Sequence, residues 1–158
     1  MRGVVRKTSR AAGREAAEEV LRSAYVGHLA TVYADGGPYV VAVNYGWAGG
    51  RIYFHGTPQG DKLENLRREP RVCFAVEENN GVIPADQPCE ASIAYKSAVV
   101  FGRARVVEDA AEKLAALTAI ARQAGLAGEV SPRKAEGPTV VAIEPEVVTA
   151  KVRERPPN

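Results

Sequence analysis

Short apolar runs along the chain alternate with segments in which apolar residues recur every three or four positions. The recurrence over residues 14–24 predicts an amphipathic helix with one buried face. Two further helices are expected, one over 61–68 and one that begins after Asp109. Asp61 and Asp109 are each followed three positions later by a glutamate, so both are expected to act as N-caps.

The remaining apolar runs are bounded by turn residues, which predicts antiparallel strands joined by short connections. These strands are expected over residues 27–34, 39–45, 51–55, 71–77, 91–107 and 139–152. Glycine in a strand often marks a bend, so the fifth strand should bend or break at Gly102, and Pro145 should interrupt the last. Residues 78–90 and 125–137 are expected to be loops.

About six antiparallel strands with flanking helices predict an α+β fold that is mainly β and closes, or nearly closes, into a barrel. The length of 158 residues fits one domain, which we expect over residues 14–153. The first 14 residues contain five basic and no acidic side chains. We therefore expect residues 1–13 to form a mobile, solvated basic arm; binding of nucleic acid by this arm is the weaker alternative.

Composition excludes several classes of protein. A net charge of +2 provides no general attraction to nucleic acid or to an anionic membrane. No apolar run approaches the ~20 residues that span a bilayer, and the N-terminal segment lacks the apolar region of a secretory signal. We expect a cytosolic protein. With two histidines and no acidic cluster at metal-ligand spacing, no metal site is expected, and His28 should be buried and bonded to backbone.

One segment, residues 53–62, carries recognisable chemistry. A strand there ends in a glycine-containing loop that leads directly into a helix, and helix N-termini attract anions. His55, Thr57 and Lys62 add an imidazole, a hydroxyl and a fixed positive charge, a combination that suits a phosphate monoester. The glycine spacing is neither a Walker loop nor a GxGxxG fingerprint. From these residues alone, a solvated Lys62 and a strand-end His55 without a ligand are equally compatible.

Four segments resemble the pyridoxamine 5′-phosphate oxidase-related flavin-binding family, and within it the nitroimidazole-reductase-like branch. They are GHLATV (27–32), DGGPYVVAVNYGW (35–47), RIYFHGTPQGDKLENLRREPRVCF (51–74) and YKSAVVFGRARVVED (95–109). The likeness keeps the family's order from about residue 20 to residue 151. It implies a split β-barrel that forms a homodimer and holds two FMN molecules at its interface.

The resemblance also implies the residues that contact the cofactor. They are Val41, Ala42, Val43, Asn44, His55, Thr57, Lys62 and Ser97. In the family, the loop after His55 and the Lys62 position hold the phosphate, while the strand 41–44 lies along the isoalloxazine edge through its backbone. Ser97 reaches the cofactor, often across the dimer. His55 lies beside the flavin, where an imidazole can act as a proton donor near neutral pH.

The implied function is that of an FMN-dependent oxidoreductase acting on a small molecule, with electrons from a reduced nicotinamide or a partner protein. F420 or haem in the same fold, or a flavin-binding regulatory module without turnover, are the alternatives. The chain has Ala42 where many relatives have proline. It also lacks the C-terminal Arg-x-His signature of true pyridoxamine phosphate oxidases, so vitamin B6 oxidation is not expected. Tyr45 and Trp47 are expected either to line the ligand pocket or to fill the dimer interface.

Overall fold

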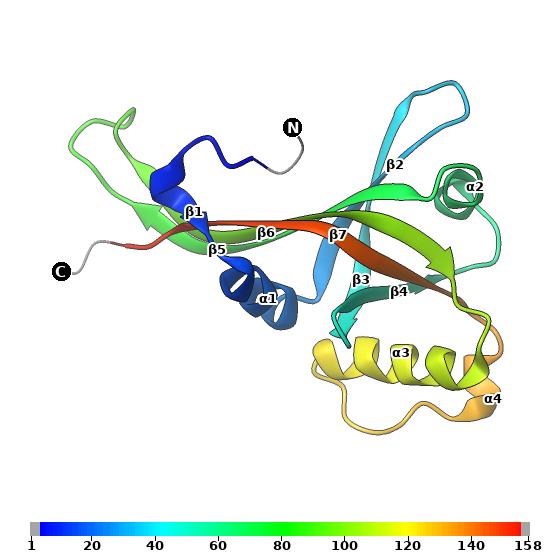
Figure 1. Cartoon of the computed structure of the whole chain (residues 1–158). Coiled ribbons are helices and arrows are strands. Elements are labelled where there is room, and N and C mark those ends of the chain that lie inside the picture. Colours follow the sequence, from blue (N-terminus) through cyan, green and yellow to red (C-terminus); the bar gives the residue numbers. More distant parts are fainter. Residues whose placement is uncertain (1–3, 156–158) are drawn as a thin grey trace.

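The computed structural model describes residues 4–155 and consists mainly of antiparallel strands (Figure 1). The strands are β1 (Ala11–Ala12), β2 (Val26–Val32), β3 (Pro38–Ala48), β4 (Arg51–Gly56), β5 (Arg71–Ile83), β6 (Ser92–Val106) and β7 (Thr139–Arg153). The order is β1-β7-β4-β3-β2-β5-β6, and β6 also pairs with β7 along most of its length. This last pairing closes β2 to β7 into a barrel, which confirms the predicted fold class.

The helices lie outside the barrel. They are η1 (Thr8–Arg10), α1 (Arg14–Ser23), α2 (Asp61–Arg68), α3 (Ala110–Gln123) and α4 (Pro132–Ala135). Asp109 caps α3 as predicted, because its Oδ1 accepts a hydrogen bond from the Glu112 N–H at 2.7 Å. The predicted cap at Asp61 is wrong. The N-cap of α2 is Gly60, and the Asp61 carboxylate instead accepts a hydrogen bond from the Tyr33 hydroxyl at 3.0 Å.

The hydrophobic core has two parts, one inside the barrel and one between the barrel and α3. Tyr45 is fully buried in the first, where its ring meets Phe74 edge to face at 5.0 Å and its hydroxyl donates to the Leu21 carbonyl. Burial raises the pKa of Tyr45. Both expectations for Tyr45 are therefore wrong, because alternation along β3 directs it inward. Trp47 is half-buried, and its backbone N–H donates to the side-chain oxygen of Gln123 on α3.

Two segments expected to be loops contain regular structure. β5 continues to Ile83, because its polar residues pair with β6, with a register shift between Asn79 and Val82. The short helix α4 lies within 125–137. β6 is not broken at Gly102; it has a register irregularity against β7 there, with Pro145 opposite. For β5 and β6, backbone pairing with a strand distant in sequence, which local composition does not encode, determines the structure.

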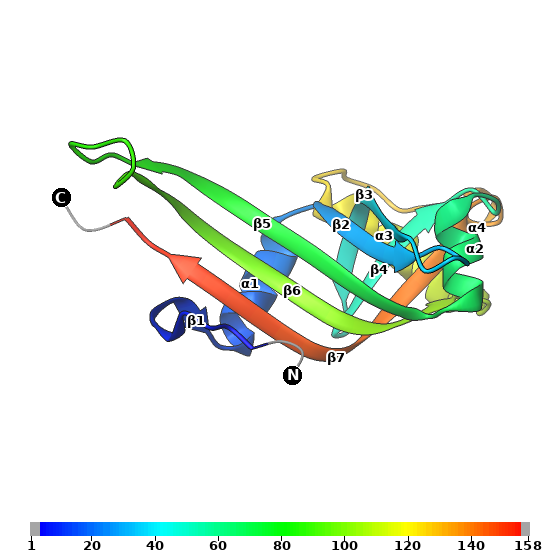
Figure 2. The same ribbon diagram turned by 90° about the horizontal axis from the view of Figure 1, so that it is seen from above.

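Residues 8–12 of the N-terminal segment also have a defined place. η1 leads into β1, whose Ala11 pairs with Lys151 of β7. Mobility of residues 1–13 stays a prediction, and residues 1–3 lie outside the described part of the chain. β5, β6 and β7 run side by side and extend well beyond the barrel as a three-stranded arm (Figure 2). None of the helices within residues 4–155 has the length and apolarity needed to cross a membrane.

Candidate functional site

An unpaired strand edge forms the first part of the candidate site. β3 pairs with β2 from Pro38 to Asn44, but its pairing with β4 begins only at Tyr45. Over Pro38–Asn44, the second edge of β3 thus has no strand partner anywhere in residues 4–155. Backbone N–H and C=O groups on such an edge need hydrogen-bond partners, so this edge can bind the rim of a planar polar ligand.

The side chains of this segment alternate between the barrel interior and the outside. Val43 is buried and Val41 half-buried, whereas Ala42 and Asn44 are exposed. Any contact of Val41 or Val43 with a ligand must therefore pass through the backbone. Asn44 and His55 each lie one residue beyond the last β3–β4 pair, Tyr45–Phe54, and both are exposed. The fold brings these two predicted site residues together on the outer surface.

Lys62 lies over the glycine that ends β4. A Cβ added to Gly56 would lie 2.8 Å from Lys62 Cε and 3.0 Å from its Nζ. Lys62 is half-buried and makes no ion pair with other described residues. The N–H groups of Leu63 and Glu64 both bond the Gly60 carbonyl, but those of Asp61 and Lys62 find no partner within residues 4–155. Free N–H groups beside an unpaired ammonium form a site for an anion.

Other groups around this loop are already engaged. The Thr57 hydroxyl donates to the Gln59 carbonyl at 2.8 Å, so it must turn away from that carbonyl before it can donate to a ligand. Arg67 donates to the Pro58 carbonyl at 3.3 Å, and Arg68 donates to the Val32 carbonyl. The Asp61 carboxylate would repel an anion, but the Tyr33 hydroxyl holds it. Lys62 is thus the main cationic group of the site.

Ser97 does not join this group within one chain. It lies on β6, separated from β3 by β2 and β5 in the barrel. Three strand spacings correspond to roughly 14 Å along the sheet, too far for one small ring to reach both residues. Ser97 is half-buried and lies opposite Glu77 on one side and Lys151 on the other. The structure therefore assembles most of the predicted site, without Ser97.

The prediction that His28 is buried and bonded to backbone is wrong. Its side chain is 46% exposed, and its Nδ1 lies 3.8 Å from Glu77 Oε2 on β5. The reason is alternation along β2: Gly27, which contacts the Phe74 ring, and Leu29 face the interior, so His28 faces outward. The pattern of residues 27–32 contained this signal. His28 lies opposite Ala42, on the same outer surface as the candidate site.

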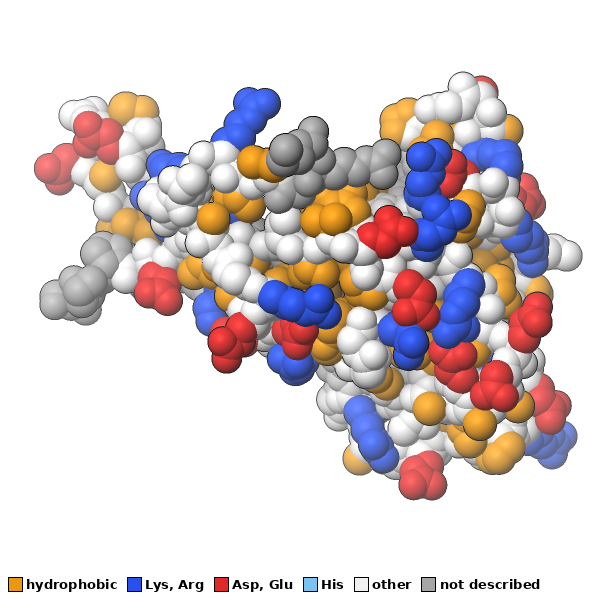
Figure 3. Space-filling model, in the orientation of Figure 1, with side chains coloured by type: hydrophobic (Ala, Val, Ile, Leu, Met, Phe, Trp, Pro, Cys, Tyr) orange, Lys and Arg blue, Asp and Glu red, His pale blue; other side chains and the backbone are white. Residues whose placement is uncertain are grey.

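Outward-facing apolar residues form a continuous row across five strands. In order of pairing, this outer row consists of Val40, Ala30, Cys73, Phe101 and Val147. Val40 is 65% exposed and Val147 38% exposed. Partial burial raises the pKa of the Cys73 thiol. Hydrophobic side chains are visible between charged ones on the face shown in Figure 3. A contiguous exposed apolar surface of this kind is typical of an interaction surface.

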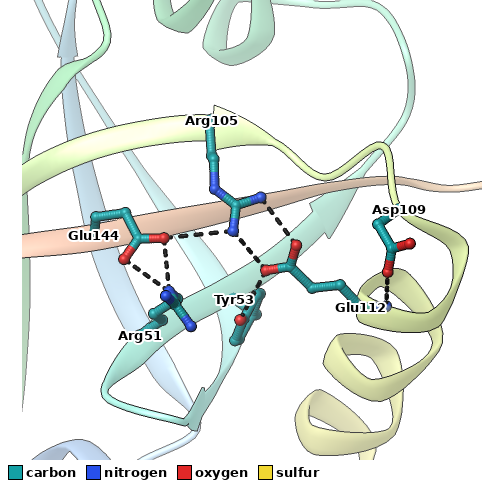
Figure 4. A network of polar contacts seen from close by, with 6 residues as sticks. All are labelled: Arg51, Tyr53, Arg105, Asp109, Glu112 and Glu144. Atoms are coloured by element: carbon teal, nitrogen blue, oxygen red, sulfur yellow. Dashed lines mark hydrogen bonds and ion pairs between the residues drawn. The ribbon is translucent and has the colours of Figure 1, made fainter.

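A network of charged residues connects the barrel to α3 (Figure 4). Arg51 donates to both carboxylate oxygens of Glu144, at 2.6 and 2.7 Å. Arg105 bonds Glu112 at 2.6 and 3.1 Å and Glu144 at 3.4 Å, and the Tyr53 hydroxyl bonds Glu112 at 3.0 Å. Each charged group here has a partner, so the network connects α3 to the barrel. No group of three or more potential metal-ligating side chains occurs within residues 4–155.

The closed antiparallel barrel with outer helices and a long strand extension defines a split β-barrel protein. A site for a planar polar ligand and an anion lies on its outer surface. The chain belongs to the pyridoxamine 5′-phosphate oxidase family, whose sequence profile matches residues 13–152. This confirms the family inferred from sequence. No curated protein matches the chain.

Solved structures agree with this assignment. A candidate 5-nitroimidazole antibiotic resistance protein from Bacteroides thetaiotaomicron is 28% identical, with a TM-score of 0.76 over 89% of this chain and 84% of the other. The flavocytochrome Anf3 from Azotobacter vinelandii is 23% identical, with a TM-score of 0.81 over 98% and 74%. A haem-binding protein from Mycobacterium smegmatis is 25% identical, with a TM-score of 0.60 over 92% and 54%. At 23% identity, the likeness to the flavocytochrome concerns the fold alone.

Proposed function

We propose that this protein is an FMN-dependent oxidoreductase of the nitroimidazole-reductase-like type, active as a cytosolic homodimer on a small-molecule substrate. The observation that carries the proposal is the unpaired edge of β3 over Pro38–Asn44. The last β3–β4 pair is Tyr45–Phe54, and β4 then leads through His55 to Gly56, over which Lys62 lies. A flavin mononucleotide combines a planar ring with hydrogen-bonding atoms on its rim and a phosphate monoester, and these two features match the edge and the loop.

Each part of the site has a role in this proposal. Lys62 and the free N–H groups at the start of α2 hold the phosphate. The backbone of Val41–Asn44 holds the rim of the ring, and the small side chain of Ala42 leaves room for its face. Thr57 contributes after its hydroxyl turns from Gln59. Bound FMN supplies the electron transfer, and the protein supplies orientation and a pocket that excludes competing reactions.

His55 is the proposed proton donor. Its exposed imidazole lies beside Asn44 at the end of the ring-binding edge, so it can reach a substrate stacked on the ring. A protonated imidazole donates a proton near neutral pH and stabilises negative charge on the molecule being reduced. The electron donor is a reduced nicotinamide or a partner protein.

The second copy of the chain completes the site in this proposal. Ser97 lies three strands away from the β3 edge in one chain, so it would act on the cofactor bound to the partner. The outer row defined above supplies an apolar surface that a second copy can cover. The site and the interface would then share one surface, and FMN binding would depend on dimerisation.

FMN titration tests the proposal directly. The purified chain should show a flavin absorption spectrum or take up FMN in a 1:1 ratio to the chain. Lys62→Ala should weaken FMN binding at least about tenfold, because a charge-assisted phosphate contact is lost. Lys134→Ala, at an exposed position of α4, is the matched control and should bind normally. Unchanged affinity in Lys62→Ala would refute the phosphate assignment.

Haem is the second candidate, favoured by the likeness to a haem-binding protein and by the exposed imidazoles of His28 and His55. A Soret band in the purified protein, absent from His28→Ala or His55→Ala, would support it. Mass analysis of the extracted ligand also identifies F420.

A chain that binds FMN but reduces no nitro compound or quinone with NADH or NADPH would be a flavin-binding regulatory module.

A further inference from the structure

A surface hollow of about 480 Å³ lies where the N-terminal segment meets the three-stranded arm, and it is called the basic hollow below. η1 and β1 form one wall and the end of β7 forms the other, along the edge of the arm seen in Figure 2. The volume is within the range of small-molecule binding sites. The lining includes Lys7, Ser9 and Arg10 on the first wall and Val152, Arg153 and Glu154 on the second.

Positive charge gathers in this hollow. The two segments that meet there, residues 4–12 and 151–155, carry six basic side chains and one acidic side chain, Glu154. Arg10 and Arg153 are half-buried, and Lys7 is exposed. Among residues 4–155, none of these three cations has a carboxylate partner. A half-buried guanidinium without a carboxylate attracts an anion from solution.

The acidic groups nearby do not cancel this charge. A hydrogen bond to Glu19 of α1 raises the pKa of Lys96, and Glu154 raises it further, so the Glu154 carboxylate lies near an additional cation. Glu18 of α1 is held by two arginines of its own helix, and Glu15 is in the first turn of that helix. The basic side chains around the hollow outnumber the acidic ones, so the local potential favours an anion.

Hydrogen-bond donors accompany the charges. β1 pairs with β7 at Ala150 and Lys151, and beyond Lys151 this edge of β7 has no strand partner within residues 4–155. Ser9 adds a hydroxyl on the opposite wall. Phosphate oxygens accept hydrogen bonds from guanidinium, ammonium, hydroxyl and backbone N–H groups alike. Because the cations come from two walls, they suit an anion whose charge is spread over several oxygens.

We infer that the basic hollow binds a diphosphate group, and that the molecule carrying it is a reduced nicotinamide dinucleotide. Arg10 and Arg153 donate to phosphate oxygens from the two walls, and Lys7 supplies a third positive charge.

The nicotinamide assignment rests on the proposed function. Lys151 lies opposite Ser97, which is expected to reach the flavin bound to the partner, and Arg153 is two residues further along β7. The hollow is therefore roughly 7 Å along the strand from that contact. A dinucleotide held by its diphosphate can extend its nicotinamide over this distance toward the flavin ring.

Calorimetry with inorganic pyrophosphate tests the site on the full chain saturated with FMN, so that the phosphate site at Lys62 is occupied. The wild-type chain should bind pyrophosphate, and Arg10→Gln and Arg153→Gln should each weaken this binding about fivefold. Arg133→Gln removes the same charge from α4, at the other end of the molecule in Figure 1, and should bind normally. No binding to the wild-type chain, or an equal loss in Arg133→Gln, would overturn the inference.

Steady-state reduction identifies the source of the diphosphate. Arg153→Gln should raise the KM for NADH and NADPH about fivefold. It should not change the KM for reduced nicotinamide mononucleotide, which has no diphosphate. An unchanged KM for every donor would refute the nicotinamide assignment.

Two measurements separate this inference from the proposed function. Arg153→Gln should bind FMN as tightly as wild type, because Arg153 is not part of the proposed flavin site. If the chain takes up no FMN, pyrophosphate titration of Lys62→Ala still tests the basic hollow. Binding in that variant that is lost on adding Arg153→Gln would support the hollow as a diphosphate site and leave the flavin assignment refuted.

Discussion

Gly102 shows how closely two strands of the barrel approach. A Cβ added at this position would lie 2.3 Å from the Glu144 carbonyl oxygen and 3.1 Å from its carbonyl carbon. Both are backbone atoms of β7, so the contact cannot be relieved by a side-chain rotation. The position lies at the register irregularity between β6 and β7, opposite Pro145. The φ of Gly102 is not in the left-handed region, so the backbone conformation does not require glycine. Glycine is needed here because the two backbones meet.

Gly102→Ala should therefore lower the free energy of unfolding by about 2 kcal/mol or more, because β7 must shift to admit the methyl group. Urea denaturation followed by circular dichroism measures the loss. Gly137→Ala is the control, since a Cβ there meets nothing within 4 Å. Equal stability of the two variants would show that the β6–β7 contact adapts without cost.

Among the elements, α3 is attached to the rest of the molecule at both ends. At its C-terminus, the Gln123 side chain accepts a hydrogen bond from the backbone N–H of Trp47 at 2.7 Å. It also donates to the carbonyls of Leu21, at 2.8 Å, and Ala24. At its N-terminus, Glu112 is held by Arg105 and Tyr53 (Figure 4). The helix covers the second core and joins α1, β3 and β6 through side chains.

The Glu112 network predicts a pH dependence of stability. The hydrogen bond from Arg105 holds the pKa of the Glu112 carboxyl below its ordinary value of 4.5. A carboxyl with a depressed folded-state pKa stabilises the fold above pH 4.5, and this contribution is lost as the pH falls through the folded-state pKa. Glu112→Gln should thus be less stable than wild type at pH 7, with a smaller difference below pH 4.5.

Chemical denaturation of both proteins across this pH range measures the effect. Glu129→Gln, which changes an exposed loop residue, should match wild type at every pH. A difference between Glu112→Gln and wild type that stays constant as the pH falls would mean that shape, and not charge, determines the role of Glu112.

At the scale of the whole molecule, the barrel keeps one outer surface free of helices. α3 and α4 cover the β4 and β7 side and α1 lies along the arm, whereas the outer row remains accessible. The unpaired edge of β3 and His28 both lie on strands that carry this row. A partner that covers the row would therefore also approach the candidate site.

Val40→Lys should prevent dimerisation, because it places a charge at the most exposed position of the outer row. Light scattering after gel filtration should give the monomer mass, and FMN binding should weaken with it. Leu126→Lys, at an exposed apolar position that follows α3, should leave the mass unchanged. A wild-type chain that is monomeric in the presence of FMN would refute the shared interface.

The sequence pattern was sufficient to predict most helices and strands and to identify the family. The spacing of apolar residues located α1, α2 and α3, and alternation located the six barrel strands, because both signals are local. The motif around residues 51–62 also predicted correctly that His55 and Lys62 lie at a strand–loop–helix junction. By contrast, the length of β5 and the Gly60 cap depend on contacts with β6 and Tyr33, which are distant in sequence.

By itself, then, the sequence determined which segments are strands and helices, the barrel class and the family, because apolar periodicity and short motifs are properties of neighbouring residues. Only the tertiary structure decided that β3 keeps an edge free over Pro38–Asn44, that His28 lies beside Glu77, and that Ser97 lies three strands away from β3 within one chain. These features depend on where strands far apart in sequence begin and end their pairing, and closure of the barrel sets that register.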